Sequence, residues 1–340
     1  MQDMSRRSFI VGMAGLAAFG VAGCTARGAS TSSGSTSMSS EPAPSSSDNR
    51  EANTDASRLQ SGEAQKPEAV ARTVTLNSGY EMPAFGLGTW TLSSDIAESS
   101  TYAALACGYR LVDTAEYYGN EDGVGRAIAH AAADGIAARE DVFVTSKIAP
   151  SGERDYDAAV DARLERLGLD YLDLLLVHQQ GAGDEALYQA LERAVDAGKV
   201  RSIGISNFYT SADFDRIADA ARVKPAVVQN ENHIRCQGSS LKDHAASIGA
   251  FVESYYPLGG RAHVREQLAD ETITRIAQEC GATPAQVILR WHLQSGYIAI
   301  PGSSDPAHIQ ENTGALDIEL SDADMQAIAA LDTSRRYENW

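Results

Sequence analysis

From Val70 onward the chain alternates short apolar runs, rich in β-branched residues, with longer segments whose apolar residues recur every three or four positions. The short runs predict buried strands, and the longer segments predict amphipathic helices. The strand-like runs are Phe85–Gly88, Arg110–Thr114, Val142–Ile148, Leu172–His178, Val200–Ser206, Ala226–Glu231, Phe251–Pro257 and Tyr297–Pro301. Strand–helix alternation at this spacing implies parallel strands joined by right-handed crossovers.

The helical segments between these runs complete the repeating unit. They include Ser94–Ala106, Asp155–Leu167, Glu185–Ala197 and Ala212–Ala221, and a further helix, Thr283–Leu293, precedes the last strand. Eight units in about 270 residues match a (β/α)8 TIM barrel of the α/β class. An open doubly wound sheet is the alternative, but no G-x-G-x-x-G motif follows the first strand, which favours the barrel.

Polar residues stand at or just after the carboxyl ends of most strands. They are Asp113, Lys147, His178, Ser206, Asn207, Gln229, Glu231, Tyr255, Ser303 and Ser304. A barrel gathers these ends around one mouth, so they predict a common site. Before the first barrel strand, "TVTLNSGYEMP" alternates around Asn77-Ser78-Gly79 and predicts a β-hairpin that plugs the opposite end.

The N-terminal residues predict export. Arg6-Arg7 precede an uncharged apolar run, Ile10–Gly23, which is too short to span ~30 Å of hydrocarbon comfortably. The order of a basic region, an apolar region and small residues is that of a signal peptide, and it resembles a twin-arginine signal. "VAGC", which ends at Cys24, looks like a lipobox whose cysteine is lipidated. A plain secretory signal with an incidental cysteine is the alternative.

Three domains follow from these patterns. Residues 1–24 are expected to be the signal peptide, and the Ser-rich residues 25–69 a disordered linker, because they contain too few large apolar residues to offset the entropy of ordering. Residues 70–340 form the barrel. Its cysteines, Cys107, Cys236 and Cys280, have no metal-like spacing and are expected to be free thiols. The net charge of −18 argues against a nucleic-acid partner.

Four residues near the predicted mouth suit one reaction. A tyrosine with a pKa near ~10 is a poor acid at neutral pH, and a neighbouring lysine is expected to lower that pKa. Asp113 supplies the counter-charge for Lys147, and a neutral His178 can orient a carbonyl beside Tyr118. Each residue alone has an ordinary structural explanation. Together they protonate a carbonyl that receives an external hydride, and they provide neither a metal set nor the paired carboxylates of a glycosidase.

The sequence resembles the aldo/keto reductase family. The resemblance rests on "GLGTW", "GYRLVDTAEYYGNEDGVGRAI", "VTSKI", "LDLLLVH", "GKVRSIGISNF", "SYYPLGG" and "QVILRWHLQSGYIAIPGSSDPAHIQEN". It implies a (β/α)8 barrel and reversible reduction of aldehydes or ketones with NADP(H), or alternatively NAD(H).

The resemblance also implies roles for individual residues. The catalytic residues are Asp113, Tyr118, Lys147 and His178, with Tyr118 as the general acid because it stands five residues after the aspartate. The cofactor-binding residues are Gly88, Thr89, Asp113, Ser206, Asn207, Gln229, Tyr255, Leu258, Ser303, Ser304, His308, Glu311 and Asn312. Of these, Ser206, Asn207 and Gln229 would hold the carboxamide, and Tyr255 would stack on the nicotinamide. Trp90, Tyr118, His178 and Gln179 are expected to line the substrate pocket.

The chain departs from the family pattern at two places. Many members carry a Lys just after "IP" and an Arg six positions later, which hold the 2′-phosphate of NADP; here these positions are Gly302 and His308. Weaker discrimination for NADP over NAD is therefore expected, unless a neighbour such as Arg261 supplies the charge. Gln179-Gln180 replace a common Trp-Pro pair, which predicts a more polar or roomier pocket.

Two functions follow from these features. The first is a monomeric NAD(P)H-dependent reductase of small carbonyl compounds, exported by the twin-arginine machinery and held by lipid on the extracytoplasmic face of a bacterial membrane. It would be cytoplasmic before export. The alternative is a redox-sensing or scaffold subunit that binds cofactor with little turnover.

Overall fold

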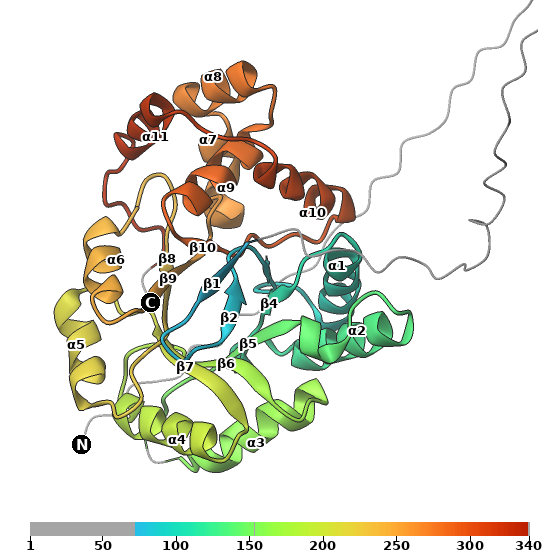
Figure 1. Ribbon diagram of the computed structural model, residues 1–340, viewed down its shortest axis with the longest axis vertical. Coiled ribbons are helices and arrows are strands. Elements are labelled where there is room, and N and C mark those ends of the chain that lie inside the picture. Colours follow the sequence, from blue (N-terminus) through green and yellow to red (C-terminus); the bar gives the residue numbers. More distant parts are fainter. Residues whose placement is uncertain (1–71, 153, 339–340) are drawn as a thin grey trace, which may run out of the picture. The chain divides into compact units, whose positions relative to one another are not determined.

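Parallel strands arranged in a ring dominate the computed structural model, which describes residues 72–152 and 154–338 (Figure 1). The eight strands follow one another around the sheet in chain order, from β3 to β10. The predicted signal peptide, Cys24 and the Ser-rich linker lie outside the described residues. Among the residues that are described, no helix is long and apolar enough to cross a membrane.

The strands are short and every neighbouring pair is parallel. Their bounds are β3 Leu87–Gly88, β4 Leu111–Asp113, β5 Phe143–Ile148, β6 Leu172–Val177, β7 Val200–Ser206, β8 Val227–Glu231, β9 Phe251–Tyr255 and β10 Ile298–Ala299. A parallel bridge between Phe85 and Ala299 joins the first strand to the last, and the Gly86 amide donates to the Ala299 carbonyl at 3.0 Å. The predicted (β/α)8 barrel is therefore confirmed.

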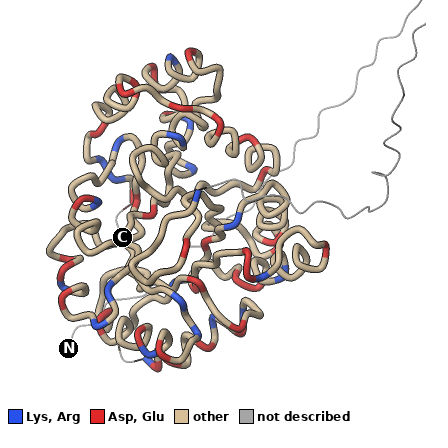
Figure 2. The backbone as a smooth tube through the Cα atoms, viewed as in Figure 1, with Lys and Arg blue, Asp and Glu red and all other residues tan. Residues whose placement is uncertain are grey.

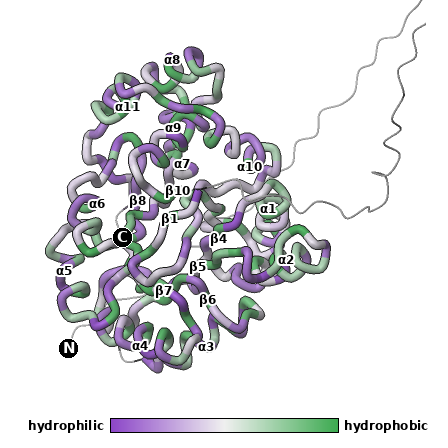
Figure 3. The backbone as a smooth tube through the Cα atoms, in the orientation of Figure 1, coloured by the Kyte–Doolittle hydropathy of each residue, from purple (hydrophilic) through white to green (hydrophobic). Residues whose placement is uncertain are grey.

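Helices connect the strands and cover the outside of the ring. In chain order they are α1 Ser94–Ala106, α2 Glu121–Ala133, α3 Tyr156–Leu167, α4 Asp184–Asp196, α5 Ser211–Ala220, α6 Ser239–Ala246, α7 Gly260–Leu268, α8 Glu271–Cys280, α9 Pro284–Gln294, α10 Pro306–Thr313 and α11 Asp322–Ala329. Hydrophilic and hydrophobic stretches alternate along these helices, as expected for helices with one buried face (Figure 3). The helix predicted before the last strand is α9, whereas α7 and α8 were not predicted.

The predicted hairpin closes the end of the barrel from which the strands start. Its strands, β1 Thr73–Thr75 and β2 Glu81–Pro83, pair antiparallel. Met82 is fully buried and packs in the barrel interior with Leu111 and Ile298. The side chain of Asn77 donates to the carbonyl of Pro225, just before β8, at 2.8 Å. These contacts place the hairpin across the amino ends of the strands, opposite the predicted mouth.

Several strands end earlier than the apolar runs suggested. The run Phe251–Pro257 predicted a longer strand, but β9 stops at Tyr255 because Tyr256 adopts a left-handed φ of 52°. The run ending at Pro301 gives only Ile298–Ala299 as β10, and a proline has no amide hydrogen for the ladder. Apolar composition marks buried backbone, but it does not distinguish a strand from the buried turn that follows it.

Charged residues lie mostly on the outer elements, where acidic and basic residues alternate (Figure 2). Many of them pair, for example Arg216 with Asp184 at 2.6 Å. Cys107, Cys236 and Cys280 are free thiols, as predicted. A few charged or ionisable residues are exceptions. Asp113, Lys147 and Glu253 are almost completely buried within the barrel.

Candidate active site

The carboxyl ends of β4, β5 and β6 bring three of the predicted catalytic residues together. Asp113 ends β4, Lys147 lies near the end of β5, and His178 follows β6 directly. Tyr118 reaches them from the short 3-10 turn Glu116–Tyr118, which follows β4. The four side chains thus come from separate elements, and the parallel pairing of β4 with β5 and of β5 with β6 brings these strand ends side by side.

Lys147 is the centre of this group. Its ammonium nitrogen lies 2.5 Å from Asp113 Oδ1, 3.0 Å from the Thr114 carbonyl oxygen and 3.0 Å from the Tyr118 hydroxyl. Burial acts to lower the pKa of Lys147, but the charge of Asp113 and the contact with Tyr118 outweigh it, and the pKa is raised. Lys147 is therefore a cation at neutral pH, and its charge is directed at the tyrosine hydroxyl.

The net pKa of Tyr118 differs from the prediction. Lys147 was expected to lower it, yet burial raises it to about 12 and the lysine only reduces that rise. The predicted direction of the pKa shift is wrong, because the free energy needed to remove a phenolate from water exceeds the stabilisation that one neighbouring ammonium provides. As a result, Tyr118 keeps its proton across the neutral range and remains a hydrogen-bond donor toward the cavity.

His178 is neutral, as the sequence analysis expected. Burial lowers its pKa to about 3, with a further contribution from the charge of Lys147. Its ring meets that of Tyr118 edge-on, with ring centroids 5.7 Å apart. His178 Nδ1 is buried and has no hydrogen-bond partner among residues 72–152 and 154–338. A neutral imidazole in this position can donate to, and orient, an oxygen atom bound beside Tyr118.

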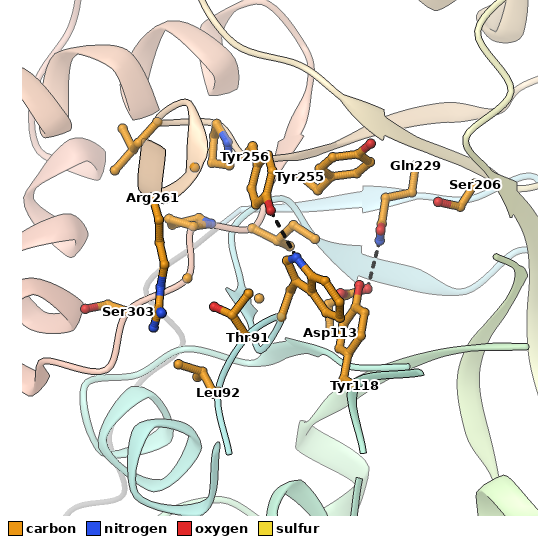
Figure 4. Close-up of a pocket in the computed structure, with 18 of the residues that line it drawn as sticks. Thr91, Leu92, Asp113, Tyr118, Ser206, Gln229, Tyr255, Tyr256, Arg261 and Ser303 are labelled. Carbon is orange, nitrogen blue, oxygen red and sulfur yellow. Dashed lines mark hydrogen bonds between the residues drawn. The ribbon is translucent and has the colours of Figure 1, made fainter. Parts of the chain in front are cut away.

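Asp113, Tyr118 and His178 line a cavity of about 520 Å³ at the mouth of the barrel, and Lys147 is buried behind them (Figure 4). The wall includes most of the residues predicted for cofactor or substrate: Gly88, Trp90, Asp113, Tyr118, His178, Gln179, Ser206, Asn207, Gln229, Tyr255, Leu258, Ser303 and Ser304. Its volume and mixed polar and apolar wall are those of a small-molecule or cofactor site.

Four predicted cofactor residues do not line this cavity. Thr89 is fully buried, and its hydroxyl donates to the Asp113 carbonyl at 2.9 Å, which supports the end of β4. His308, Glu311 and Asn312 lie on α10, beyond the cavity wall. The side chain of His308 is two-thirds exposed, 67%. The roles assigned to these residues through the family resemblance remain predictions.

The residues predicted to hold the nicotinamide are neighbours. Asn207 follows β7 with a left-handed φ of 63°, and its amide donates to the His178 carbonyl at 2.8 Å. The Tyr255 hydroxyl donates to Asn207 Oδ1 at 2.8 Å, and the residue lines the cavity. A ring anchored at its hydroxyl in this way can offer a flat face to a planar ligand.

The two tyrosines at positions 117 and 118 have different surroundings. Tyr117 is 58% exposed, and its ring lies 5.5 Å from that of His178, at the edge of the cavity. The ring of Tyr118 lies 4.8 Å from Trp90, whose indole nitrogen donates to the Tyr256 hydroxyl at 3.0 Å. Trp90 therefore forms one wall beside Tyr118, and a dashed line from the Tyr256 hydroxyl marks this hydrogen bond in Figure 4.

Three features of the mouth were not predicted from the sequence: the buried Glu253, the position of Tyr256 and the attachment of the C-terminal segment. Glu253 is fully buried on β9 and accepts a hydrogen bond from Gln229, while burial and the charge of Asp113 raise the pKa of Glu253 to about 8. Residues two positions apart on a strand lie on the same face, so Glu253 shares the face of Tyr255. The spacing of Glu253 from this predicted site residue could therefore have indicated that it belongs to the site. Tyr256 was not predicted as a site residue, because the sequence pattern assigned it to the strand Phe251–Pro257.

The third unpredicted feature is the attachment of the C-terminal segment. The backbone amides of Tyr337 and Glu338 donate to the two oxygens of Glu231 at 2.5 and 3.0 Å. The ring of Tyr337 stacks between those of His233 and His263, at 4.3 and 3.7 Å. Glu231, at the end of β8, therefore fixes the segment beside the mouth instead of facing the cavity.

One basic side chain lines the other side of the cavity. Arg261, on the first turn of α7, lies on the same side as Ser303 and away from Asp113 and Tyr118 (Figure 4). The residue is exposed. Within the described residues no cluster of His, Cys, Asp or Glu is arranged to hold a metal ion. The polar groups at this mouth therefore suit proton transfer at one end and anion binding at the other.

Comparison with known proteins agrees with this geometry. The sequence profile of the aldo/keto reductase family matches residues 84–333. An aldo-keto reductase of Mycolicibacterium smegmatis is 40% identical over 77% of this chain and 94% of its own length. The glyoxal reductase of Bacillus subtilis is 40% identical over 79% of this chain and 96% of its own length.

A solved structure matches as well. The crystal structure of a Bombyx mori aldo-keto reductase in complex with NADP superposes with a TM-score of 0.73 at 30% identity, covering 79% of this chain and 95% of that one. Both the fold and the sequence match thus extend over nearly the whole length of the relatives. The chain belongs to the aldo/keto reductase family.

Proposed function

We propose that the protein reduces aldehyde or ketone groups of small molecules to alcohols with a nicotinamide dinucleotide, and that Tyr118 is the proton donor. The observation that carries this function is the chain Asp113–Lys147–Tyr118, closed by bonds of 2.5 and 3.0 Å at the wall of the cavity. The relatives support it, since one is a glyoxal reductase and another binds NADP.

The cavity has groups that fit such a cofactor. Tyr255 offers a flat ring held at its hydroxyl, while Ser206, Asn207 and Gln229 place amide and hydroxyl groups beside it. When bound, the reduced dinucleotide supplies the hydride. Arg261 and Ser303 stand at the far end of the cavity, where they can donate to the phosphates of the same molecule.

The residues of the chain then handle the substrate oxygen and its proton. His178 and Tyr118 donate hydrogen bonds to the carbonyl oxygen and polarise it. As hydride adds to the carbonyl carbon, negative charge develops on the carbonyl oxygen, and this oxygen takes the proton of Tyr118. The ammonium of Lys147 stabilises the resulting phenolate, and Asp113 holds the ammonium in place. The reverse sequence oxidises an alcohol.

The substrate end of the cavity favours small carbonyl compounds. Trp90 forms one wall, and Gln179 stands where many family members have a tryptophan. An amide side chain offers hydrogen bonds instead of a flat apolar surface, so short polar aldehydes and ketones are the preferred class. The B. subtilis relative, a glyoxal reductase, acts on a compound of this kind according to its name.

Cofactor preference depends on the loss of two basic positions. With Gly302 and His308 in place of Lys and Arg, two charge-assisted contacts to a 2′-phosphate are absent, each worth ~1.5–3 kcal/mol. Arg261 supplies part of that charge from a different element. Dual use of NADPH and NADH with modest discrimination is therefore proposed. A preference for NADPH above roughly a thousandfold in kcat/KM, about 4 kcal/mol, would contradict it.

The deciding experiment is steady-state reduction of a panel of aldehydes and ketones by the purified chain, with Tyr118→Phe as the control. Turnover that is lost in the variant supports the reductase. The second candidate, a redox-sensing subunit with little turnover, is favoured instead if cofactor binds and shifts its fluorescence while no carbonyl in the panel is reduced.

The N-terminal pattern adds a proposal about location. Export by the twin-arginine machinery and lipid attachment at Cys24 would place the reductase on the extracytoplasmic face of a bacterial membrane. Fractionation of cells that express the full chain, together with Arg6→Lys/Arg7→Lys and Cys24→Ala variants, tests each step. The first variant should stay in the cytoplasm, and the second should lose the membrane fraction. Equal distribution of all three would refute the proposal.

A further inference from the structure

Gln229 has an unusual hydrogen-bond arrangement beneath the proposed nicotinamide site. Its amide nitrogen donates both to Asp113 Oδ2 at 2.8 Å and to Glu253 Oε2 at 2.7 Å. A primary amide has two hydrogens, so both donors of Gln229 are used. The bond from Gln229 to Asp113 is drawn in Figure 4. Both acceptors lie inside the barrel, on β4 and β9.

The other end of the same side chain is turned to the cavity. Gln229 lines the cavity wall, and no hydrogen bond from residues 72–152 or 154–338 reaches its Oε1 atom. Residue exposure is only 1%, and Oε1 is the polar side-chain atom of Gln229 that remains for a ligand. The amide is thus oriented with its nitrogen inward and its acceptor outward.

Glu253 contributes to this orientation although it does not face the cavity. It is fully buried and has no counter-ion in direct contact. Burial, followed by the charge of Asp113, raises its pKa to about 8, while Gln229 and Lys147 act in the opposite direction. From the other neighbouring strand, β10, the residue paired with Glu253 is Ile298. The raised pKa favours the uncharged acid, and in either form the carboxyl oxygen of Glu253 accepts from Gln229.

We propose that Glu253 is a positioning residue which, together with Asp113, holds Gln229 so that its oxygen accepts the amide hydrogen of the nicotinamide carboxamide. The idea rests on the proposed function, because it assumes that the nicotinamide binds at Tyr255, Asn207 and Gln229. A fixed acceptor at this point recognises a carboxamide, which has an N–H to donate, and discriminates against a group of the same shape that lacks one.

A binding experiment tests this orientation without using turnover. Dissociation constants are measured at pH 7 for NADP⁺ and for its 3-acetylpyridine analogue, in which a methyl ketone replaces the carboxamide. The wild type should bind NADP⁺ roughly tenfold more tightly than the analogue, the effect of one hydrogen bond. Glu253→Gln keeps an uncharged acceptor of the same length and should retain that ratio to within about twofold.

Two other variants remove the acceptor. Glu253→Met keeps the length but cannot accept strongly, and Glu253→Asp withdraws the acceptor by one methylene. In both, Asp113 alone holds the amide of Gln229, its orientation is less tightly fixed, and the ratio should fall to roughly one to three. Ser254→Ala, which removes a buried hydroxyl on the adjacent residue of β9, is the matched control and should behave as the wild type.

The outcomes distinguish the positioning role of Glu253 from the proposed reductase function. If Glu253→Met or Glu253→Asp folds and keeps the tenfold ratio, or if Glu253→Gln loses it, the positioning role is overturned. Should Glu253→Met not fold, the comparison of Glu253→Asp with Glu253→Gln decides. A wild type that shows the ratio but reduces no carbonyl would refute the proposed function and leave this inference standing. A wild type that binds no NADP⁺ would refute both.

Discussion

The Lys147 ammonium nitrogen lies 3.0 Å from the Tyr118 hydroxyl. The adjacent Tyr117 is 58% exposed and packs against His178. Only one of the two consecutive tyrosines is therefore coupled to the buried Asp113–Lys147 pair. The pairing makes the two phenol groups chemically different although they are neighbours in sequence.

Tyr118→Phe is expected to lower kcat for carbonyl reduction by roughly 10²–10⁴-fold, because it removes the proton donor. The dissociation constant for NADPH should change less than about threefold, since the ring remains in place. Tyr117→Phe should change kcat less than about threefold. Single-turnover reduction and fluorescence titration measure both quantities, and equal losses in the two variants would contradict the assignment.

Arg261→Ala is expected to affect the two cofactors unequally. Loss of a guanidinium contact to the 2′-phosphate, which only NADPH carries, should lower kcat/KM for NADPH by roughly 10- to 100-fold and that for NADH by less than about threefold. Arg265→Ala, an exposed arginine of the same helix that does not line the cavity, is the control. Equal losses with both cofactors would instead place Arg261 at a phosphate that the two share.

Glu231→Gln should release the C-terminal segment. The Glu231 carboxylate accepts from the amides of Tyr337 and Glu338 and from His233 Nε2 at 2.9 Å. Burial works against its charge, but these bonds hold the pKa of Glu231 below its usual range. Replacing it weakens several charge-assisted bonds of ~1.5–3 kcal/mol each.

Hydrogen exchange at residues 336–338 should accelerate by at least about tenfold, and the melting temperature should fall by a few degrees. The exposed Glu165, on α3, provides the control variant Glu165→Gln. Unchanged protection of the segment in Glu231→Gln would show that the stacking of Tyr337 alone holds it.

Acid should destabilise the fold partly through a buried histidine that is not one of the four catalytic residues. His292 is fully buried, and burial lowers its pKa to about 3. An unfolded histidine has a pKa near ~6.5, so below that pH the unfolded chain binds a proton that the native chain does not. Stability is then lost as pH falls from about 6.5 toward 3, by ~1.4 kcal/mol per pH unit.

His292→Asn removes this proton uptake. The slope of the unfolding free energy against pH, measured by denaturant titration between pH 4.5 and 6, should become shallower by ~1.4 kcal/mol per unit. The exposed His130, which is solvated in both states, gives the control variant His130→Asn. A slope for His292→Asn equal to that of the wild type would refute this source of acid sensitivity.

Much of the barrel could be predicted from periodicity. Val200–Ser206 and Ser94–Ala106 have the predicted bounds, since an apolar run and an amphipathic pattern each end at a polar or glycine-rich turn. The ends of β9 and β10 could not be predicted, because a left-handed residue at Tyr256 and a proline at position 301 end pairing while the chain stays buried. Helices α7 and α8 lie between β9 and β10, where three helices follow one another without a strand between them to mark their ends.

The candidate site was predictable where strand ends meet, and less so where partners are remote. Asp113 and Lys147 follow from the rule that barrel strand ends share one mouth. The net pKa of Tyr118 did not follow, because it depends on how deeply the phenol is buried, a property of the packed barrel. Glu253 was overlooked because a single carboxylate within an apolar run gives no indication of the amide that it contacts across the sheet.

The hairpin at the base of the barrel also sets where the described chain joins the barrel. The described chain begins at Arg72, whose carbonyl accepts from the Ala84 amide just after β2, opposite the mouth. The described chain therefore reaches the barrel at its closed end, away from Tyr118 and the cavity. Shortening residues 25–69 should accordingly leave the KM for a carbonyl substrate unchanged.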